Sequence, residues 1–215
     1  MKEIDLNGIT HIRPIREGTP EWYFGIDYTC GDLYEAQEIF ETEHSYKGNR
    51  MYIVHFPDGE VFEPVVSRED LAIGEPVCHG GKISFVTLDL KSGIITIHRF
   101  SCNTHKVSTV TQIPLDSIND CYNLRLFEHP LCLTRQPNDG TLEFIWPERK
   151  VISISDHESF FYRDEDRLFF DLWHEDPDYR TETVIRSYKS GEITERLSGD
   201  IQIMPDGGIW HLKGS

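Results

Sequence analysis

Leu90-Lys91-Ser92-Gly93-Ile94 interrupts a hydrophobic run that stops at the turn and resumes directly after it. Glycine adopts the positive φ that tight hairpin turns require, so this stretch predicts two antiparallel strands joined by a hairpin. Four further turns of the same kind lie before and after it, at Phe56–Glu60, Pro137–Thr141, Tyr188–Glu192 and Met204–Gly208. Their recurrence predicts an all-β chain that repeats one antiparallel unit.

The segment after the predicted strand Trp22–Tyr28 is ambiguous. Asp32 and Glu35 have the spacing of a capping box, and one helical face would carry Leu33, Ala36 and Phe40. The same apolar residues also suit a pair of short strands. Because the surroundings are β throughout, we favour strands and expect any helix to be confined to Asp32–Glu43.

The spacing of the turns indicates how the strands are grouped. Gly93 and Gly140 are 47 residues apart, and Gly140 and Gly191 are 51 apart, close to the length of a four-stranded propeller blade. The sequence therefore predicts one all-β domain over residues 1–215, a small β-propeller-like ring of four to five blades. Gly208–Leu212 is expected to pair into the N-terminal blade and close the ring. The alternative is an irregular β-sandwich or an open barrel of the same strands.

Part of the chain resembles a known repeat family. Tyr188–Asp200, followed by Met204-Pro205-Asp206-Gly207, is similar to the outer hairpin and next inner strand of TolB-type β-propeller repeats, and Val86–Gly93 resembles the same hairpin. The turn at Pro57-Asp58-Gly59 departs from this pattern, and the chain has no Trp-Asp dipeptide. The resemblance implies a propeller fold and carries no catalytic residues.

The net charge of the chain disfavours two classes of binding partner. The net charge is −16, which repels nucleic-acid phosphate and anionic membranes, so we expect neither as a partner. Eight acids and no Lys or Arg lie between Glu17 and Glu43, and ten acids against three Arg lie between Asp156 and Glu182. We expect these two acidic stretches to lie on neighbouring blades, where they are a solvated surface or a docking face for a basic partner.

The five cysteines form an odd, scattered set without a C-x-x-C pair: Cys30, Cys78, Cys102, Cys121 and Cys132. Disulfide frameworks and zinc sites prefer even or closely spaced sets, so we expect reduced thiols and no zinc. The N-terminus shows no signal-peptide pattern and no run reaches 18 apolar residues. A cytoplasmic location is expected.

Few residues of the sequence are candidates for catalysis or for binding a metal or a ligand. Cys78-His79-Gly80-Gly81 is more typical of a turn before a strand than of a reactive thiol, and Asp164–Asp166 of an acidic loop than of a Ca²⁺ site. No catalytic motif, metal site or cofactor motif is recognisable. The residues that we select as a possible ligand-binding set combine aromatic, imidazole and carboxylate groups: Trp22, Trp173, His174, Glu175 and Asp176.

Two classes of function remain. We expect a non-enzymatic binding or scaffold protein that presents loops around a propeller axis to a protein or small-molecule partner. The alternative is a hydrolase or lyase with axial carboxylates and a divalent metal.

Overall fold

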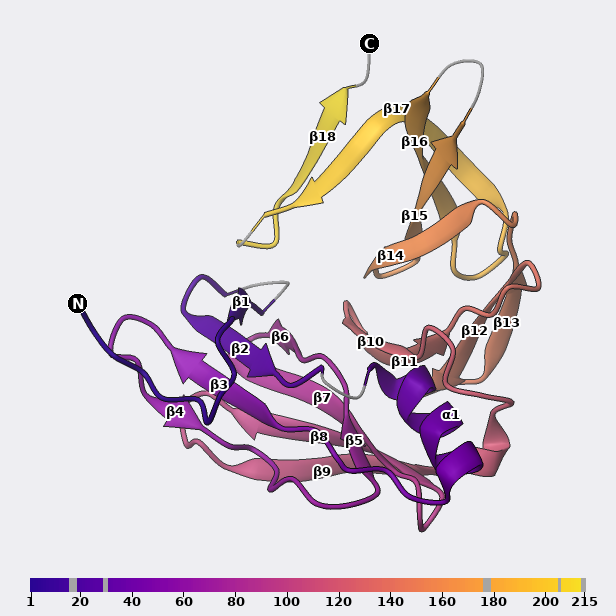
Figure 1. The fold of residues 1–215 in the computed structure, drawn as a ribbon. Coiled ribbons are helices and arrows are strands. Elements are labelled where there is room, and N and C mark those ends of the chain that lie inside the picture. Colours follow the sequence, from indigo (N-terminus) through magenta and orange to yellow (C-terminus); the bar gives the residue numbers. More distant parts are fainter. Residues whose placement is uncertain (16–18, 29–30, 176–178, 205, 214–215) are drawn as a thin grey trace. The chain divides into compact units, whose positions relative to one another are not determined.

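The computed structural model describes residues 1–15, 19–28, 31–175, 179–204 and 206–213. The chain forms two compact units, Met1–Leu126 and Phe127–Ser215. Each unit is built mainly from antiparallel sheets whose strands follow one another as meanders (Figure 1). The all-β prediction is confirmed, and the four sheets have the strand number and order of propeller blades. Whether the chain acts as one domain stays a prediction.

The first unit contains two sheets. One sheet has the order β1-β2-β3-β4, with bounds Arg13–Pro14, Trp22–Ile26, Met51–His55 and Val61–Phe62. The other has the order β5-β7-β8-β9, and the short strand β6 pairs with the beginning of β7, on the edge opposite β8. The bounds of β5 to β9, in chain order, are Leu71–Ile73, Val77–His79, Lys82–Asp89, Ile94–Ser101 and Val107–Pro114. β8, which carries apolar residues on both faces, is a central strand between β7 and β9. A short 3-10 helix, Leu115–Ser117, follows β9.

The third and fourth sheets are simple meanders. The boundary between the units falls within β10, and the third sheet has the order β10-β11-β12-β13, with bounds Arg125–Glu128, Leu131–Arg135, Thr141–Trp146 and Lys150–Ser153. The fourth has the order β14-β15-β16-β17-β18, with bounds Glu158–Asp164, Arg167–His174, Arg180–Ser187, Ile193–Ile203 and Ile209–Lys213.

The turn glycines behave as the sequence predicts. All five adopt positive φ, with values of 71°, 66°, 75°, 76° and 81° at Gly59, Gly93, Gly140, Gly191 and Gly207. A side chain at these positions would be strained, and this explains why Gly recurs there. In the turn between β16 and β17, the Asp166 carboxylate also accepts hydrogen bonds from the Ser187 hydroxyl and the Lys189 amide, both at 3.0 Å.

Each unit has its own core. In the first unit both sheets contribute fully buried side chains to one cluster, including Met51, Ile53, Ile83, Phe85 and Phe100. In the second unit the third and fourth sheets share another cluster, which includes Leu142, Phe144, Leu168, Phe170 and Val184. Aromatic rings carry much of both clusters, because each ring buries about 150–250 Å² of surface.

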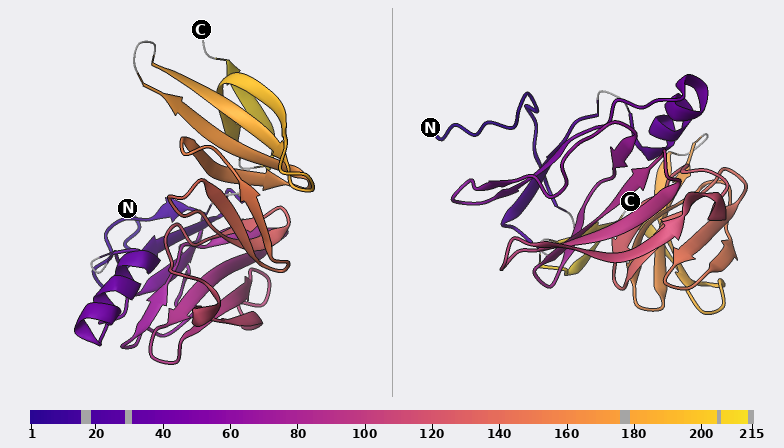
Figure 2. Two further views of the ribbon diagram at one scale, coloured as in Figure 1. Left: turned by 90° about the vertical axis from the view of Figure 1, so that its right-hand side faces the viewer. Right: turned by 90° about the horizontal axis from the view of Figure 1, so that it is seen from below.

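Our preference for strands at residues 32–43 is wrong. Leu33–Glu43 is the α-helix α1, and it lies against the side of the first unit (Figures 1 and 2). Its capping box is complete, since the Asp32 carboxylate accepts from the Tyr34 and Glu35 amides and the Glu35 carboxylate accepts from the Asp32 amide. These local bonds outweigh the β character of the neighbouring segments. No second α-helix occurs in the part of the chain that the structure describes.

The C-terminal strand also differs from the expectation. β18 pairs in register with the second half of β17, from Gly199↔Lys213 to Ile203↔Ile209, and stands at the end of the fourth sheet. The turn after β17 is tight enough for a local hairpin, with Met204 donating its amide to the Gly208 carbonyl at 2.8 Å and accepting in turn from Gly207. A local hairpin costs less loop-closure entropy than pairing with the N-terminal sheet.

Candidate functional site

The N-terminal segment crosses over β2 in the first unit. It turns at Asn7, whose side-chain amide donates to the Tyr52 hydroxyl at 2.6 Å, and then passes close to Gly25. A Cβ atom at Gly25 would lie 3.0 Å from Ile9 Cγ2 and 3.2 Å from the His11 carbonyl oxygen. Glycine at this position therefore allows residues 9–12 to approach the strand closely.

This crossing forms part of the wall of an open cavity of about 420 Å³, which we call the Arg50 cavity. Its wall comes from three segments, residues 7–13, the end of β2 through Tyr28, and the two residues Lys47 and Arg50 before β3. The Asp27 amide donates to the Arg50 carbonyl at 2.9 Å and so fixes the second and third segments to each other. All of these residues belong to the first unit.

One side of the cavity has a neutralised cation. The Arg13 guanidinium donates to the Glu75 carboxylate at 2.8 Å and also bonds the Tyr28 hydroxyl, which itself donates to Glu75 at 2.7 Å. Arg13 lies over the rings of Phe24 and Tyr28, 5.1 and 5.3 Å from their centres. The pKa of Tyr28 is raised by partial burial and by the hydrogen bond and charge of Glu75, while Arg13 opposes the shift. Tyr28 is therefore a neutral hydrogen-bond donor.

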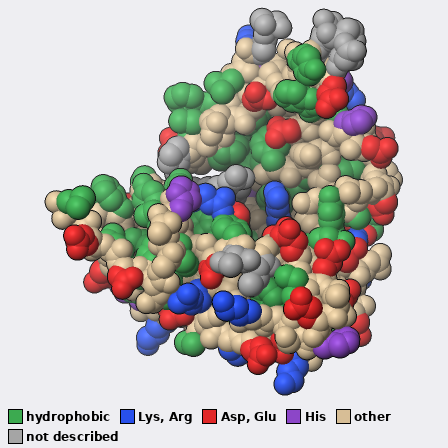
Figure 3. Space-filling model, viewed as in Figure 1, with side chains coloured by type: hydrophobic (Ala, Val, Ile, Leu, Met, Phe, Trp, Pro, Cys, Tyr) green, Lys and Arg blue, Asp and Glu red, His purple; other side chains and the backbone are tan. Residues whose placement is uncertain are grey.

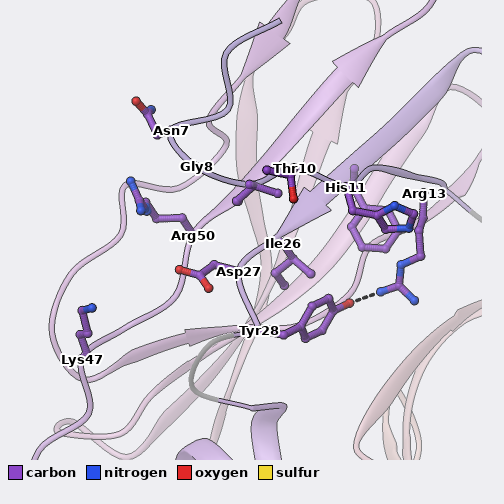
Figure 4. A pocket seen from close by; sticks show the side chains of 12 residues that line it. Asn7, Gly8, Thr10, His11, Arg13, Ile26, Asp27, Tyr28, Lys47 and Arg50 are labelled. Carbon is purple, nitrogen blue, oxygen red and sulfur yellow. Dashed lines mark hydrogen bonds between the residues drawn. The ribbon is translucent and has the colours of Figure 1, made fainter.

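The other side holds cations without this compensation. In Figure 4, Arg50 and Lys47 lie on one side and His11 and Arg13 on the other, with Asp27 near Arg50. Neither Lys47 nor Arg50 forms an ion pair with another described side chain, although Arg50 is half-buried. Between these two sides the wall is lined by Ile9 and by the buried residues Phe24 and Ile26. The cavity thus combines a cationic side with an apolar middle.

The residues selected from the sequence lie at different places. Trp22 is only 5% exposed and packs in the core of the first unit, where it also lines a second cavity. Trp173 and His174 end β15 in the second unit, and Glu175 follows them. Asp176 lies outside the described residues.

The described second-unit members of this set, Trp173, His174 and Glu175, are consecutive in the chain. Trp173 is 54% exposed, with its ring centre 6.2 Å from that of Tyr179. His174 lies 3.5 Å from the Glu182 carboxylate. The set as a ligand site stays a prediction.

Two acidic side chains of the second unit form local contacts within the fold. Asp166 organises a turn, as described above, and Asp164 pairs with Arg167. Among the residues with described positions, no three His, Cys, Asp or Glu side chains are arranged to share a metal ion. Figure 3 shows one face of the molecule, on which acidic side chains are dispersed among hydrophobic and basic ones. The docking of a basic partner to the acidic stretches stays a prediction.

The histidine on the central strand β8 also has a structural environment. His98 Nε2 lies 2.9 Å from the Thr87 hydroxyl oxygen, and its ring stacks on Phe85 with centres 5.1 Å apart. Burial lowers the pKa of His98, which favours the neutral ring.

Sequence reasoning missed the Arg50 cavity. Its wall joins residues up to 43 positions apart, and only the pairing of β1, β2 and β3 brings them together. One signal was present in the sequence: Lys47 and Arg50 directly follow the stretch Glu17–Glu43, which contains no Lys or Arg.

No family model and no curated protein matches the sequence. A solved structure from Bacteroides ovatus ATCC 8483, described as a "putative dipeptidyl aminopeptidase IV", is similar at a TM-score of 0.46 with 7% identity over 75% of this chain. This chain spans 29% of that protein's length, and a likeness of this degree says nothing of activity. No helix among the described residues has the length and apolar character needed to cross a membrane.

Proposed function

We propose that this chain is a non-enzymatic binding protein whose first unit takes up a small organic carboxylate in the Arg50 cavity. One observation carries the proposal: Arg50 is half-buried in the wall of a cavity that Lys47 also lines, and it has no ion-pair partner among the described side chains. In a chain of net charge −16, two cations on one cavity wall that form no ion pair with a described side chain are suited to an external anion, although the Asp27 carboxylate also lines this wall.

The rest of the wall specifies the class of ligand. A guanidinium binds a carboxylate through two parallel hydrogen bonds, and the Lys47 ammonium adds a second positive charge. Phe24, Ile26 and Ile9 supply apolar contact for the body of the ligand. The volume of about 420 Å³ lies in the range of about 300–1,000 Å³ that small-molecule cavities occupy. These features favour a compact carboxylate with an apolar or aromatic body.

The ionisable groups suit binding better than proton transfer. Arginine stays protonated at all ordinary pH values. The Tyr28 phenol is held neutral by its raised pKa. Both groups therefore keep one protonation state and can act as fixed donors.

The test is a calorimetric titration with 4-phenylbutyrate and its neutral analogue 4-phenylbutan-1-ol. At about 0.3 kcal/mol per non-hydrogen atom, a ligand of this size binds with a Kd on the order of millimolar. We expect the carboxylate to bind and the alcohol to bind at least about tenfold more weakly, because charge-assisted hydrogen bonds contribute about 1.5–3 kcal/mol.

Two variants locate the binding. Arg50→Gln should weaken 4-phenylbutyrate binding about tenfold or more, whereas Lys106→Gln should leave it unchanged, because exposed Lys106 does not line the cavity. Equal binding of the two ligands, or an equal loss in both variants, would contradict the proposal.

A further inference from the structure

Asp27 supplies a carboxylate in the wall of the Arg50 cavity. It directly follows β2, whose last ladder pair with β3 is Ile26↔Met51, and the next pair in the same register is Asp27 with Arg50. The hydrogen bond from the Asp27 amide to the Arg50 carbonyl at 2.9 Å confirms this register. Residues directly opposite one another point to the same face of a sheet, with Cβ atoms about 4.5–5.5 Å apart. The fold therefore places a carboxylate beside the Arg50 side chain.

The N-terminal segment crosses the face of the sheet to which these two side chains belong. Tyr52 follows Arg50 by two residues and so shares its face, and Ile9 packs on the cluster that contains Tyr52. Figure 4 shows Asp27 and Arg50 together on one side of the cavity, with residues 7–10 along its upper edge. A ligand between the N-terminal segment and the sheet therefore meets both charges.

The two opposite charges are close but do not pair with each other. Arg50 forms no ion pair with a described side chain, Asp27 included, and both side chains are half-buried. A carboxylate has two oxygens with about four lone-pair sites, so Asp27 can accept a hydrogen bond from a ligand in addition to those within the protein. The wall is thus suited to a ligand that carries a negative and a positive group next to each other.

We propose that the ligand of the Arg50 cavity is an α-amino acid with an apolar side chain, whose carboxylate is bound by Arg50 and Lys47 and whose ammonium group is bound by Asp27. This inference rests on the proposed function and narrows it from carboxylates in general to zwitterions. In an α-amino acid a single carbon atom carries both charged groups, so both can reach side chains that are opposite each other in a ladder. The apolar side chain of the ligand then lies against the apolar middle of the wall.

The wall selects against ligands that have only one of the two charges. A monocarboxylate bound to Arg50 is repelled by the nearby Asp27 carboxylate, and an amine bound to Asp27 is repelled by Arg50 and Lys47. An apolar amino acid avoids both repulsions, because each of its charged groups lies against the opposite charge. Specificity of this kind comes from the unfavourable contacts of the wrong ligand as well as from the favourable contacts of the right one.

The test compares 4-phenylbutyrate with L-2-amino-4-phenylbutanoate, which differs from it only by the α-ammonium group. In calorimetric titrations of the unaltered protein at neutral pH, we expect the amino acid to bind at least about tenfold more tightly, because it adds a charge-assisted hydrogen bond to Asp27. Its N-acetyl derivative, which lacks the ammonium charge, should bind no more tightly than 4-phenylbutyrate. Equal or weaker binding of the amino acid relative to 4-phenylbutyrate would overturn the inference.

The variant Asp27→Asn should reverse the preference between the two ligands. It should weaken binding of the amino acid about tenfold and strengthen binding of 4-phenylbutyrate, since it removes a negative charge next to the carboxylate of that ligand. Opposite changes for two ligands cannot arise from a general loss of folded protein. Asp116→Asn is the matched control and should leave both affinities unchanged, because exposed Asp116 does not line the cavity. Parallel losses for both ligands in Asp27→Asn would contradict the role of Asp27.

These titrations also separate the inference from the function on which it rests. If 4-phenylbutyrate binds through Arg50 and the amino acid gains nothing, the carboxylate site stands and the assignment of Asp27 fails. If neither ligand binds, both proposals fail. The three ligands decide the matter on the unaltered protein even where the Asp27→Asn variant does not fold.

Discussion

Arg186 in the second unit and Arg50 in the first unit are both half-buried, but of the two only Arg186 has a charge partner among the described side chains. Arg186 binds the buried Glu158 carboxylate through two nitrogens, at 2.8 and 3.0 Å, and donates to the Gly191 carbonyl at 2.8 Å. Arg50 lines a cavity and has no ion pair with a described side chain. The difference separates an arginine whose charge is paired within the fold from one that lines a cavity and that we propose to bind a ligand.

Other arginines of the second unit follow the pattern of Arg186. Arg135 is 3% exposed and lies 3.1 Å from the Glu143 carboxylate. Arg163 lies over the Tyr188 ring, 3.9 Å from its centre, and donates to the Glu165 carbonyl at 3.0 Å. Ion pairs and packing against aromatic rings offset the free-energy cost of burying these charges, so these arginines are part of the core.

The largest expected effect is in the buried pair of the second unit. Glu158→Gln should reduce the free energy of unfolding by about 3–5 kcal/mol, because it leaves the Arg186 charge buried without its carboxylate. Urea denaturation measures the loss. Glu182→Gln is the control, since Glu182 pairs with half-exposed Arg180 and Arg196 and should cost about 0–1 kcal/mol. Equal losses of unfolding free energy in the two variants would contradict the expected difference between the buried and the exposed ion pair.

A smaller effect is expected at an exposed pair of the first unit. Burial raises the pKa of Asp89, but hydrogen bonds from the Ser92 amide and from Arg68 outweigh it, and the pKa is lowered. The pair therefore contributes stability above the pKa of an unfolded Asp, and the contribution is lost as pH falls through the lowered pKa. Arg68→Gln should raise the Asp89 pKa toward its ordinary value, as measured by an NMR titration of the carboxyl carbon. An unchanged pKa would show that Ser92 alone sets it.

Features that depend on a few neighbouring residues could be predicted from the sequence. Gly93 and Gly191 adopt the positive φ that their turns require, because a hairpin turn is decided by a few neighbouring residues. The capping box at Asp32 and Glu35 is also visible in the sequence, and its three local hydrogen bonds form although the neighbouring segments are β. The helix shows that the local signal was the stronger one.

The two cavities depend on contacts that the sequence pattern does not show. Arg50 meets residues 7–13 only because Gly25 allows the N-terminal segment to cross β2 closely. Cys78 and Cys102 line one cavity although β6 and β8 lie on opposite sides of β7. A one-residue slip in either ladder would turn these side chains to the opposite face, so spacing along the chain could not reveal the pairs.

The comparison between the two arginines can be tested in a single NMR spectrum of the side-chain Nε–H groups. Addition of 4-phenylbutyrate should shift the Arg50 signal in a saturable manner and leave the Arg186 signal unchanged, because Glu158 already occupies the Arg186 guanidinium. Assignments come from the Arg50→Gln and Arg186→Gln spectra. An unchanged Arg50 signal at saturating ligand, or equal shifts at both arginines, would contradict the account.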